Sequence, residues 1–205
     1  MKKFPIWKKS RALGFSLLGN KKEFRRGMIP PGQHGQKKTK KRKISLYAAQ
    51  NREKQKLRFT HGLKEKQLKN LYLELEKKEG NTIQHILNHL IPRLDKVIFR
   101  SGLVSTYLWA RKWVTQKHFL VNQKKINKPG YLVEPNDVIS LKENTRSNKL
   151  IQQQLQQNVK TPDFLKLDKE KLEITYLRHP SMEELEKEVE GIDIASVVAW
   201  YNKRI

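Results

Sequence analysis

The sequence contains no cysteine in its 205 residues. This absence excludes disulfide bonds and thiolate metal sites, and it leaves the redox compartment undecided. Long hydrophobic runs are missing too: no stretch of about eighteen apolar residues occurs, and the mean hydropathy is −0.78. A membrane is therefore expected, at most, as a surface partner, and no spanning segment is predicted.

Recognisable catalytic motifs are also missing. No glycine-rich phosphate loop precedes a predicted helix, and no serine, histidine and aspartate occur at a spacing that indicates a hydrolase. His85 and His89 are spaced i, i+4 and could share a metal ion, but no third ligand is placed to complete the site. We therefore predict a chain with no metal, no cofactor and no enzymatic activity.

Acidic residues are scarce, most of all in the N-terminal part. The chain has 44 Lys and Arg against 20 Asp and Glu, a formal net charge of +24. Residues 1–60 hold 19 basic residues and two acidic ones, whereas residues 163–191 hold five basic and nine acidic. So much charge of one sign repels itself unless a polyanion neutralises it. We expect a nucleic acid as the partner, with the N-terminal part facing it.

Residues 93–102 are predicted to form a helix with two different faces. Leu94, Val97 and Ile98 follow the i, i+3, i+4 spacing of a packing face, and Gly102 ends the helix. The opposite face is predicted to be cationic and available to a polyanion. It holds Arg93, Lys96 and Arg100.

A second helix is predicted to begin after Ser105 or Thr106, either of which can cap it, and to run to about Lys117. Its inward residues are Ala110, Trp113 and Val114, and its outward ones are Arg111, Lys112 and Lys117. Asp95 is interpreted as a structural partner of Arg93 or Arg111. Trp109 is interpreted either as exposed packing or as an RNA contact.

The pattern then changes to that of strands. Residues 119–122 and 138–141 are predicted strands, and the turns between them are Gln123-Lys124, Pro129-Gly130 and Pro135-Asn136. The helix pair and strands make a small α+β module of about fifty residues. Its positive charge lies on the helix pair and on the first hairpin.

One set of residues in this module is recognisable: Arg93-Leu94-Asp95, Ser105-Thr106, Ala110-Arg111, Val114, Leu120-Val121-Asn122 and Pro135-x-Asp137-Val138-Ile139. On these residues the module resembles the small RNA-binding module named after ribosomal protein four of the small subunit. The family usually has Asn-Gly where this chain has Asn122-Gln123, which predicts a different hairpin turn here. It usually has Pro-Gly-Asp where this chain has Pro135-Asn136-Asp137, a mild change because Asn adopts the left-handed conformation at modest cost.

The part of the chain before the module carries a second set of matches. PPGQHGQ at 30–36 cannot be helical, and its bare backbone can approach a phosphate. KKTKKRK at 37–43 supplies six cations. Together the two segments predict a nucleic-acid-binding arm. PPGQHGQ, the basic run and REKQKLRF at 52–59 resemble the ribosomal protein four family itself, as does the pattern at 11–18. The basic N-terminus could instead be an organellar transit peptide.

The remaining segments are mostly helical. Apolar stripes predict helices between residues 45 and 90, interrupted at Gly80-Asn81, and Pro92 is predicted to break the chain before the module. In 52–58 the four cations fall on every second residue, which spreads them around a helix and fits a helix surrounded by RNA. Strands are predicted near 165–167 and 172–177, and helices at 147–158, after Ser181, and at 194–203 after Asp193.

The predicted fold class is α+β: a mainly helical N-terminal domain, closed by the C-terminal helix, with an inserted module of a helix-turn-helix pair and a small antiparallel β-sheet. The predicted boundaries are a basic arm at 1–44, a helical domain at 45–91 plus 192–205, and an inserted α+β domain at 92–191 that contains the module at 93–143. The resemblance implies that the α+β domain is inserted into the helical domain.

The predicted RNA-binding residues are basic, small or polar side chains of the arm, the first long helix and the module. They are Lys9, Arg11, Gly32, Gln33, His34, Lys41, Arg42, Arg52, Lys56, Arg58, Arg93, Lys96, Arg100, Ser105, Thr106, Arg111, Lys112, Lys117, His118, Asn122, Lys124 and Lys125.

The resemblance implies a structural constituent of the small ribosomal subunit, monomeric within the ribosome. Its implied partners are a 5′-domain junction of small-subunit rRNA, where it nucleates assembly, mRNA near its point of entrance, and small-subunit proteins three and five, with an influence on translational accuracy. The alternative is the RNA-binding subunit of an RNA-modifying enzyme. The Lys-rich composition suggests an AT-rich genome. The chain is therefore expected in the cytoplasm of an AT-rich bacterium, or else in a plastid or mitochondrial ribosome.

Overall fold

The computed structural model describes residues 5–18, 21–25, 27–33, 35, 44–146, 149–156 and 161–203. They form two compact units, one from residues 1–86 with 189–205 and the other from residues 87–188. Helix α4 therefore begins in the first unit and ends in the second. The observed combination of helices with a small antiparallel sheet confirms the predicted α+β class.

The first unit is helical. Ser45 caps α2 by accepting the N–H of Ala48, and Asp193 caps α10 by accepting the N–H of Ser196. Both residues have the short oxygen-bearing side chain that an N-cap position favours. The elements of this unit are α1 (Ile6–Leu13), the 3-10 helix η1 (Lys22–Phe24), α2 (Leu46–Thr60), α3 (Glu65–Leu75), α4 (Thr82–Leu90) and α10 (Ile194–Asn202).

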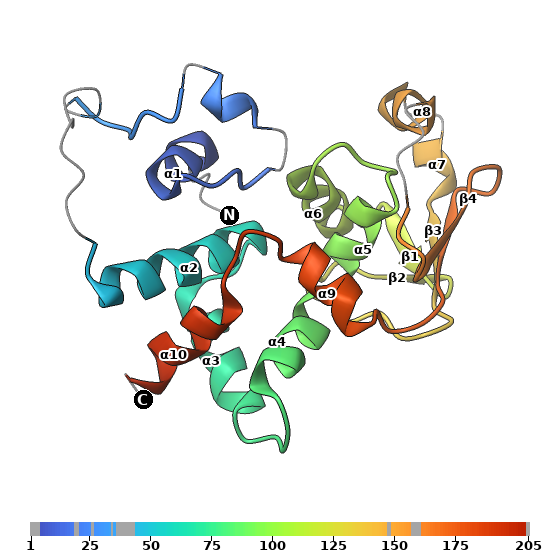
Figure 1. Ribbon diagram of the computed structural model, residues 1–205. Coiled ribbons are helices and arrows are strands. Elements are labelled where there is room, and N and C mark those ends of the chain that lie inside the picture. The colour runs from blue at the N-terminus through green and yellow to red at the C-terminus, as the bar shows by residue number, and fades with distance from the viewer. Residues whose placement is uncertain are drawn as a thin grey trace. The chain divides into compact units, whose positions relative to one another are not determined.

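The C-terminal helix α10 lies along α2 and also contacts α3 (Figure 1). The rings of Tyr72 and Tyr201 are stacked with centroids 4.7 Å apart, and both side chains are buried. The Lys54 ammonium lies 3.6 Å from the ring centroid of Trp200, and it pairs with Glu65. Segments more than a hundred residues apart in the sequence therefore share one core.

The segment after α1 is held by short polar contacts. Gly14 ends α1 in the left-handed conformation, with φ +64°. The fully buried Ser10 hydroxyl accepts the N–H of Leu17 at 3.3 Å, and Ser16 donates to the buried carboxylate of Glu23 at 2.7 Å. These contacts fix the turn between α1 and η1.

The second unit combines helices with a five-stranded antiparallel sheet of order β2-β1-β3-β5-β4. Alternate residues of the strands point into the core, among them Phe119, Ile139, Ile174 and Tyr176. The elements are α5 (Leu94–Arg100), α6 (Tyr107–Thr115), β1 (Phe119–Val121), β2 (Lys124–Lys125), β3 (Val138–Leu141), α7 (Glu143–Arg146), α8 (Lys149–Gln156), β4 (Leu165–Asp168), β5 (Glu173–Tyr176) and α9 (Met182–Glu188).

The predicted break at Pro92 is confirmed, because α4 ends at Leu90 and α5 begins at Leu94. The first N–H groups of α5 are satisfied by a loop rather than by a side chain. The N–H of Leu94 donates to the carbonyl of Tyr131 at 2.8 Å, and that of Asp95 donates to the carbonyl of Pro129 at 3.2 Å. The loop at 129–133 thereby covers the beginning of α5.

The predicted departure from the family's hairpin turn is wrong. Val121 pairs with Lys124 across β1 and β2, so Asn122 and Gln123 make a two-residue turn. Their φ angles are +47° and +64°, as the type I′ turn favoured by Asn-Gly requires at both positions. Gln123 thus occupies a conformation that glycine adopts without strain. Asn136, at φ +70°, has the left-handed conformation predicted for it.

Candidate nucleic-acid interface

A buried ionic network joins α5 to α6. Asp95 is 0% exposed and accepts two hydrogen bonds from Arg93, at 3.2 and 3.0 Å. Its Oδ2 also accepts from the Tyr107 hydroxyl at 2.9 Å and from Arg111 at 3.1 Å. Burial, reinforced by the Asp95 charge, raises the pKa of Tyr107. The structural interpretation of Asp95 is confirmed, since its carboxylate holds the helix pair together.

Lys96 and Arg100 also point into the protein. Lys96 is 6% exposed, and its ammonium lies 4.1 Å from the ring centroid of Tyr107. Burial, helped by the charge of Arg100, lowers the pKa of Lys96 to about 7. Arg100 pairs with Glu188 of α9, whose own pKa is raised by burial.

The prediction that Arg93, Lys96 and Arg100 form an available cationic face is therefore wrong. Arg93 is 7% exposed and Lys96 6%, while Arg100 is half-buried and paired. The helical spacing was correct, but α5 is packed on more sides than an amphipathic pattern indicates. Arg93 pairs with Asp95 of α5, and Arg100 pairs with Glu188, which is distant in the sequence.

The second helix and the hairpin, in contrast, carry exposed cations. Among the residues that the structure describes, no ion pair involves any of these side chains. The three residues of β1 span about 10 Å, so the end of α6 and the hairpin belong to one stretch of surface. We name this set the exposed lysine set: Lys112, Lys117, Lys124 and Lys125.

Two further lysines lie beside this set and were not predicted from the sequence. Lys128 follows the hairpin and Lys142 follows β3, and both are exposed. Nothing in their sequence context separates them from other surface lysines. Only their position next to the hairpin and the sheet makes them candidates.

Several predicted polar site residues serve the fold of the module. Thr106 caps α6 by accepting the N–H of Trp109, and His118 lies 2.9 Å from the Thr145 hydroxyl. Asn122 donates to Asp137 at 2.7 Å and accepts the N–H of Val138 at 3.0 Å, which secures the turn. Ser105 is exposed.

Most of the predicted cations on α2 are engaged within the protein. Lys56 pairs with Glu53 at 2.7 Å, and Arg58 pairs with Glu65 at 2.9 Å. Lys54 is buried against Trp200. A helix surrounded by RNA on all sides is therefore the wrong interpretation, although Arg52 is exposed.

The predicted residues of the arm are described only in part. Lys9 is exposed, with its ammonium 5.4 Å from the ring centroid of Phe59, and Arg11 is half-buried. Gly32 and Gln33 are exposed and non-helical, and Gly32 has a φ of +109°. His34, Lys41 and Arg42 lie outside the described residues, as does the basic run at 37–43.

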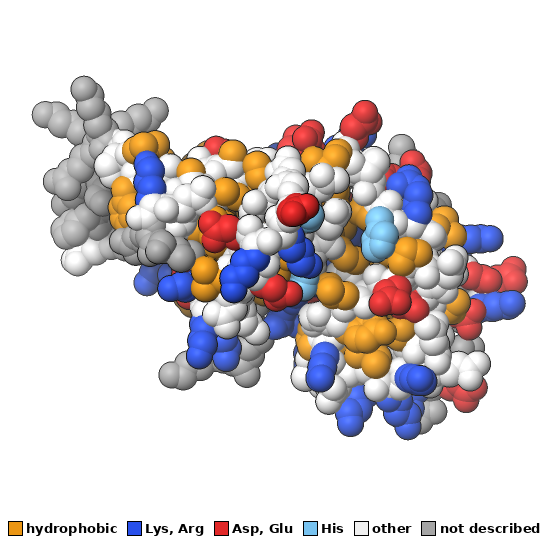
Figure 2. Space-filling model, turned by 90° about the horizontal axis from the view of Figure 1, so that it is seen from below, with side chains coloured by type: hydrophobic (Ala, Val, Ile, Leu, Met, Phe, Trp, Pro, Cys, Tyr) orange, Lys and Arg blue, Asp and Glu red, His pale blue; other side chains and the backbone are white. Residues whose placement is uncertain are grey.

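The surface in Figure 2 is mixed in character. On the face shown, lysine and arginine side chains stand out from the surface, with acidic and hydrophobic side chains between them. Positive charge is dispersed on this face. Such a surface suits contacts with separate phosphates of a folded polyanion more than contact with one continuous stripe.

The described residues offer no metal or membrane feature. No group of three or more His, Asp or Glu side chains among them is arranged around a metal position. His85 instead places its Nε2 2.9 Å from the carbonyl oxygen of Glu79. None of the helices in this part of the chain has the length and apolar character needed to cross a membrane.

Comparison with known proteins identifies the family. The model of the ribosomal protein S4/S9 N-terminal domain matches residues 1–90, and that of the S4 domain matches residues 92–139. The small ribosomal subunit protein uS4 of Ligilactobacillus salivarius (strain UCC118) is 42% identical over 200 residues, which cover 97% of each chain. The chain belongs to the ribosomal protein S4 family.

Other S4-family proteins match over almost the same length. The uS4 proteins of Geobacillus sp. (strain WCH70) and Mesoplasma florum are 41% and 40% identical, over 199 and 203 residues. These matches cover 97% of this chain in both cases, and 97% and 96% of the two relatives. The resemblance is confirmed: the chain is a non-enzymatic ribosomal protein of the small subunit, with an RNA-binding S4 domain.

Proposed function

We propose that this S4-family protein is a primary binder of small-subunit rRNA that nucleates assembly of the 5′ domain at a multi-helix junction. The observation that carries the proposal is the exposed lysine set, which lies inside or beside the segment matched by the S4 domain. Unpaired surface lysines attract phosphates and release counterions on binding. The net charge of +24 supports the same partner.

The proposed RNA-binding residues now divide into two groups. Among the described residues, exposed side chains that make no fold-stabilising contact bind phosphates or sugars directly. The buried, half-buried or hydrogen-bonded ones, Asn122 among them, act by fixing the fold that presents the direct group. The direct group contains Lys9, Gly32, Gln33, Arg52, Ser105, Lys112, Lys117, Lys124 and Lys125.

Chemical footprinting of naked small-subunit rRNA tests this function. The purified chain is added with tRNA as competitor, and base and backbone reactivities are mapped. Protection confined to a 5′-domain junction and resistant to tRNA is the expected result. Diffuse protection, or protection lost to tRNA, contradicts primary binding.

We further propose a position beside proteins three and five, where mRNA enters the subunit, with an influence on translational accuracy. The acidic segment at 163–191 supports a contact with a basic neighbour, because Glu183 and Glu186 of α9 are exposed. Crosslinking of assembled subunits from α9 is expected to capture one of these proteins. Crosslinks to other proteins alone would contradict the position.

The domain organisation and cellular location are parts of the same proposal. We propose that the inserted domain spans 92–191 and that the flanking segments form one helical domain, close to the observed unit boundaries at 86/87 and 188/189. The bacterial relatives support a ribosome in a bacterial cytoplasm. An organellar ribosome is the alternative.

A further inference from the structure

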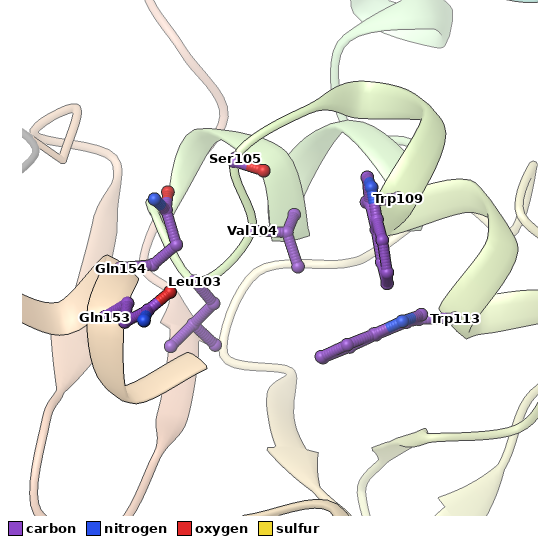
Figure 3. Close-up of a pocket in the computed structure, with 7 residues that line it drawn as sticks. All are labelled: Leu103, Val104, Ser105, Trp109, Trp113, Gln153 and Gln154. Atoms are coloured by element: carbon purple, nitrogen blue, oxygen red, sulfur yellow. The ribbon is translucent and has the colours of Figure 1, made fainter. Parts of the chain in front are cut away.

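The unit of residues 87–188 contains a pocket of about 220 Å³ beside α6 (Figure 3). It is bounded by the loop that joins α5 to α6, by two tryptophans of α6 and by two glutamines of α8. Pockets that hold drug-sized ligands have volumes of about 300–1,000 Å³. This pocket therefore suits one small planar group. Its lining residues are Leu103, Val104, Ser105, Trp109, Trp113, Gln153 and Gln154.

The two tryptophans form an L-shaped wall. Their ring centroids are 5.7 Å apart and their planes meet at 77°. Trp113 is 5% exposed and anchors the wall in the core, whereas Trp109 is 38% exposed. Figure 3 shows one face of Trp109 turned toward the space beside Val104 and Ser105. A flat ring placed in the pocket would stack on this face.

The opposite side of the pocket is polar. Gln153 is exposed and Gln154 half-buried, and Figure 3 shows both side chains across the pocket from the tryptophans. An amide group offers two N–H donors and a carbonyl acceptor, and Ser105 adds a hydroxyl. Donors and acceptors of this kind pair with the edges of a nucleobase. An aromatic hydrocarbon side chain in the pocket would offer the Gln153 amide and the Ser105 hydroxyl no hydrogen-bond partner.

The charge around the pocket favours a nucleotide. The Lys112 ammonium lies 5.4 Å from the ring centroid of Trp109, and none of the described residues that line the pocket is acidic. A base stacked on Trp109 would bring its phosphate toward this cation. Unpaired bases in RNA are commonly bound by an aromatic platform beside basic side chains.

We propose that the pocket binds one unpaired nucleobase of the rRNA, stacked on Trp109 and hydrogen-bonded at its edge by Gln153. This inference rests on the proposed rRNA-binding function and adds a base-recognition site to the phosphate contacts of the exposed lysine set. The site would select for an unstacked nucleotide at a fixed position of the junction.

The test compares full-length variants on naked small-subunit rRNA by filter binding and base-specific chemical probing. Trp109→Leu keeps an apolar side chain against Trp113 but removes the aromatic platform. It is expected to weaken binding by about 5-fold to 100-fold, the loss typical of one base–aromatic stack. It is also expected to expose a single unpaired base while the rest of the footprint persists. Trp109→Phe is expected to keep most of the affinity and most of the protection of that base.

Leu177→Ala is the matched control, because Leu177 is 43% exposed and lies in the same unit away from the pocket. Gln153→Ala tests the proposed hydrogen bond to the base edge at an exposed residue. It is expected to reduce protection of the same base. Unchanged affinity and an unchanged footprint in Trp109→Leu and Gln153→Ala would overturn the pocket proposal. Normal rRNA binding with impaired subunit incorporation would assign the pocket to a protein neighbour instead and overturn it equally.

The pocket and the general function fail in different ways. If the wild-type chain gives no junction footprint, the proposed function fails, and the pocket proposal fails with it. If the wild-type footprint is present and the variants reproduce it, only the pocket proposal fails.

Discussion

The cations of α5 and those of the α6–hairpin segment have similar side chains but different uses. Arg93, Lys96 and Arg100 are buried or paired, whereas the exposed lysine set makes no ion pair among the described residues. The positions of two carboxylates, Asp95 and Glu188, make the difference. Charge counted along a sequence therefore does not locate a binding surface until the acidic partners are placed.

The α5 cations can be buried only because other groups compensate their charge. An isolated charge in the protein interior is costly, and it is tolerated only when partners and hydrogen bonds compensate it. Asp95 meets this condition with bonds to Arg93, Tyr107 and Arg111. On this view, α5 is the scaffold of the module, and α6 with the hairpin is its contact surface.

The largest effect is expected for Asp95→Asn, which removes the central anion of the scaffold. Arg93 and Arg111 would remain buried or half-buried without a counter-charge. Breaking a buried pair from one side costs about 3–5 kcal/mol, so the free energy of unfolding measured in urea should fall by about that amount. The control Glu170→Gln alters an exposed carboxylate and should stay within about 0.5 kcal/mol of wild type. A loss as small as that of the control would mean that the network is not structural.

A pH-dependent effect is expected at Lys96. Because its pKa falls from 10.5 to about 7 in the folded chain, the unfolded chain binds the extra proton between these pH values, and stability rises with pH across that window. Lys96→Met removes this dependence. Relative to wild type, its free energy of unfolding should be raised most below pH 7, by more than about 1 kcal/mol, and the gain should shrink toward pH 10.

Denaturation of Lys96→Met and wild type from pH 6 to pH 10 measures this difference. Lys171→Met, at an exposed position, should show no pH-dependent difference over the same range. A constant difference between Lys96→Met and wild type would show that Lys96 keeps its charge and that the contrast between the two cation groups is weaker than proposed.

The smallest effect is expected at the hairpin that presents Lys124 and Lys125. Gln123 has a φ of +64°, and relief of that strain by glycine outweighs glycine's entropic cost, for a net gain of about 0.5–1 kcal/mol in Gln123→Gly. The same change in Gln116→Gly, where φ is −82°, should lower stability instead. Thermal melts of both variants give the comparison, and loss of stability in Gln123→Gly would contradict the assigned turn.

Local signals predicted much of the fold. Thr106 and Asp193 cap helices where their sequence positions indicated. The Ser181–Glu184 capping box is present at the start of α9, with the Ser181 N–H donating to Glu184 at 2.6 Å. These features depend on residues within a few positions of one another, so a sequence is sufficient to predict them.

Long-range partners limited the prediction of the site. Arg100 and Glu188 are 88 residues apart, and helical periodicity gives no information about such a pair. Lys54 is likewise covered by Trp200 from the opposite end of the chain. The turn at Asn122-Gln123 was missed for another reason: the strand pairing holds Gln123 in a conformation that its intrinsic preference disfavours.

The most direct test of the division between scaffold and contact surface is the salt dependence of rRNA binding. One variant replaces the four residues of the exposed lysine set with Gln; the other carries Arg100→Gln with Glu188→Gln, which removes a paired cation together with its partner. The first should lower the log–log salt slope by up to about 3.6, at about 0.7–0.9 per lost phosphate contact, and the second should leave it unchanged. A salt slope that is lowered in the second variant and unchanged in the first would contradict the division between scaffold and contact surface.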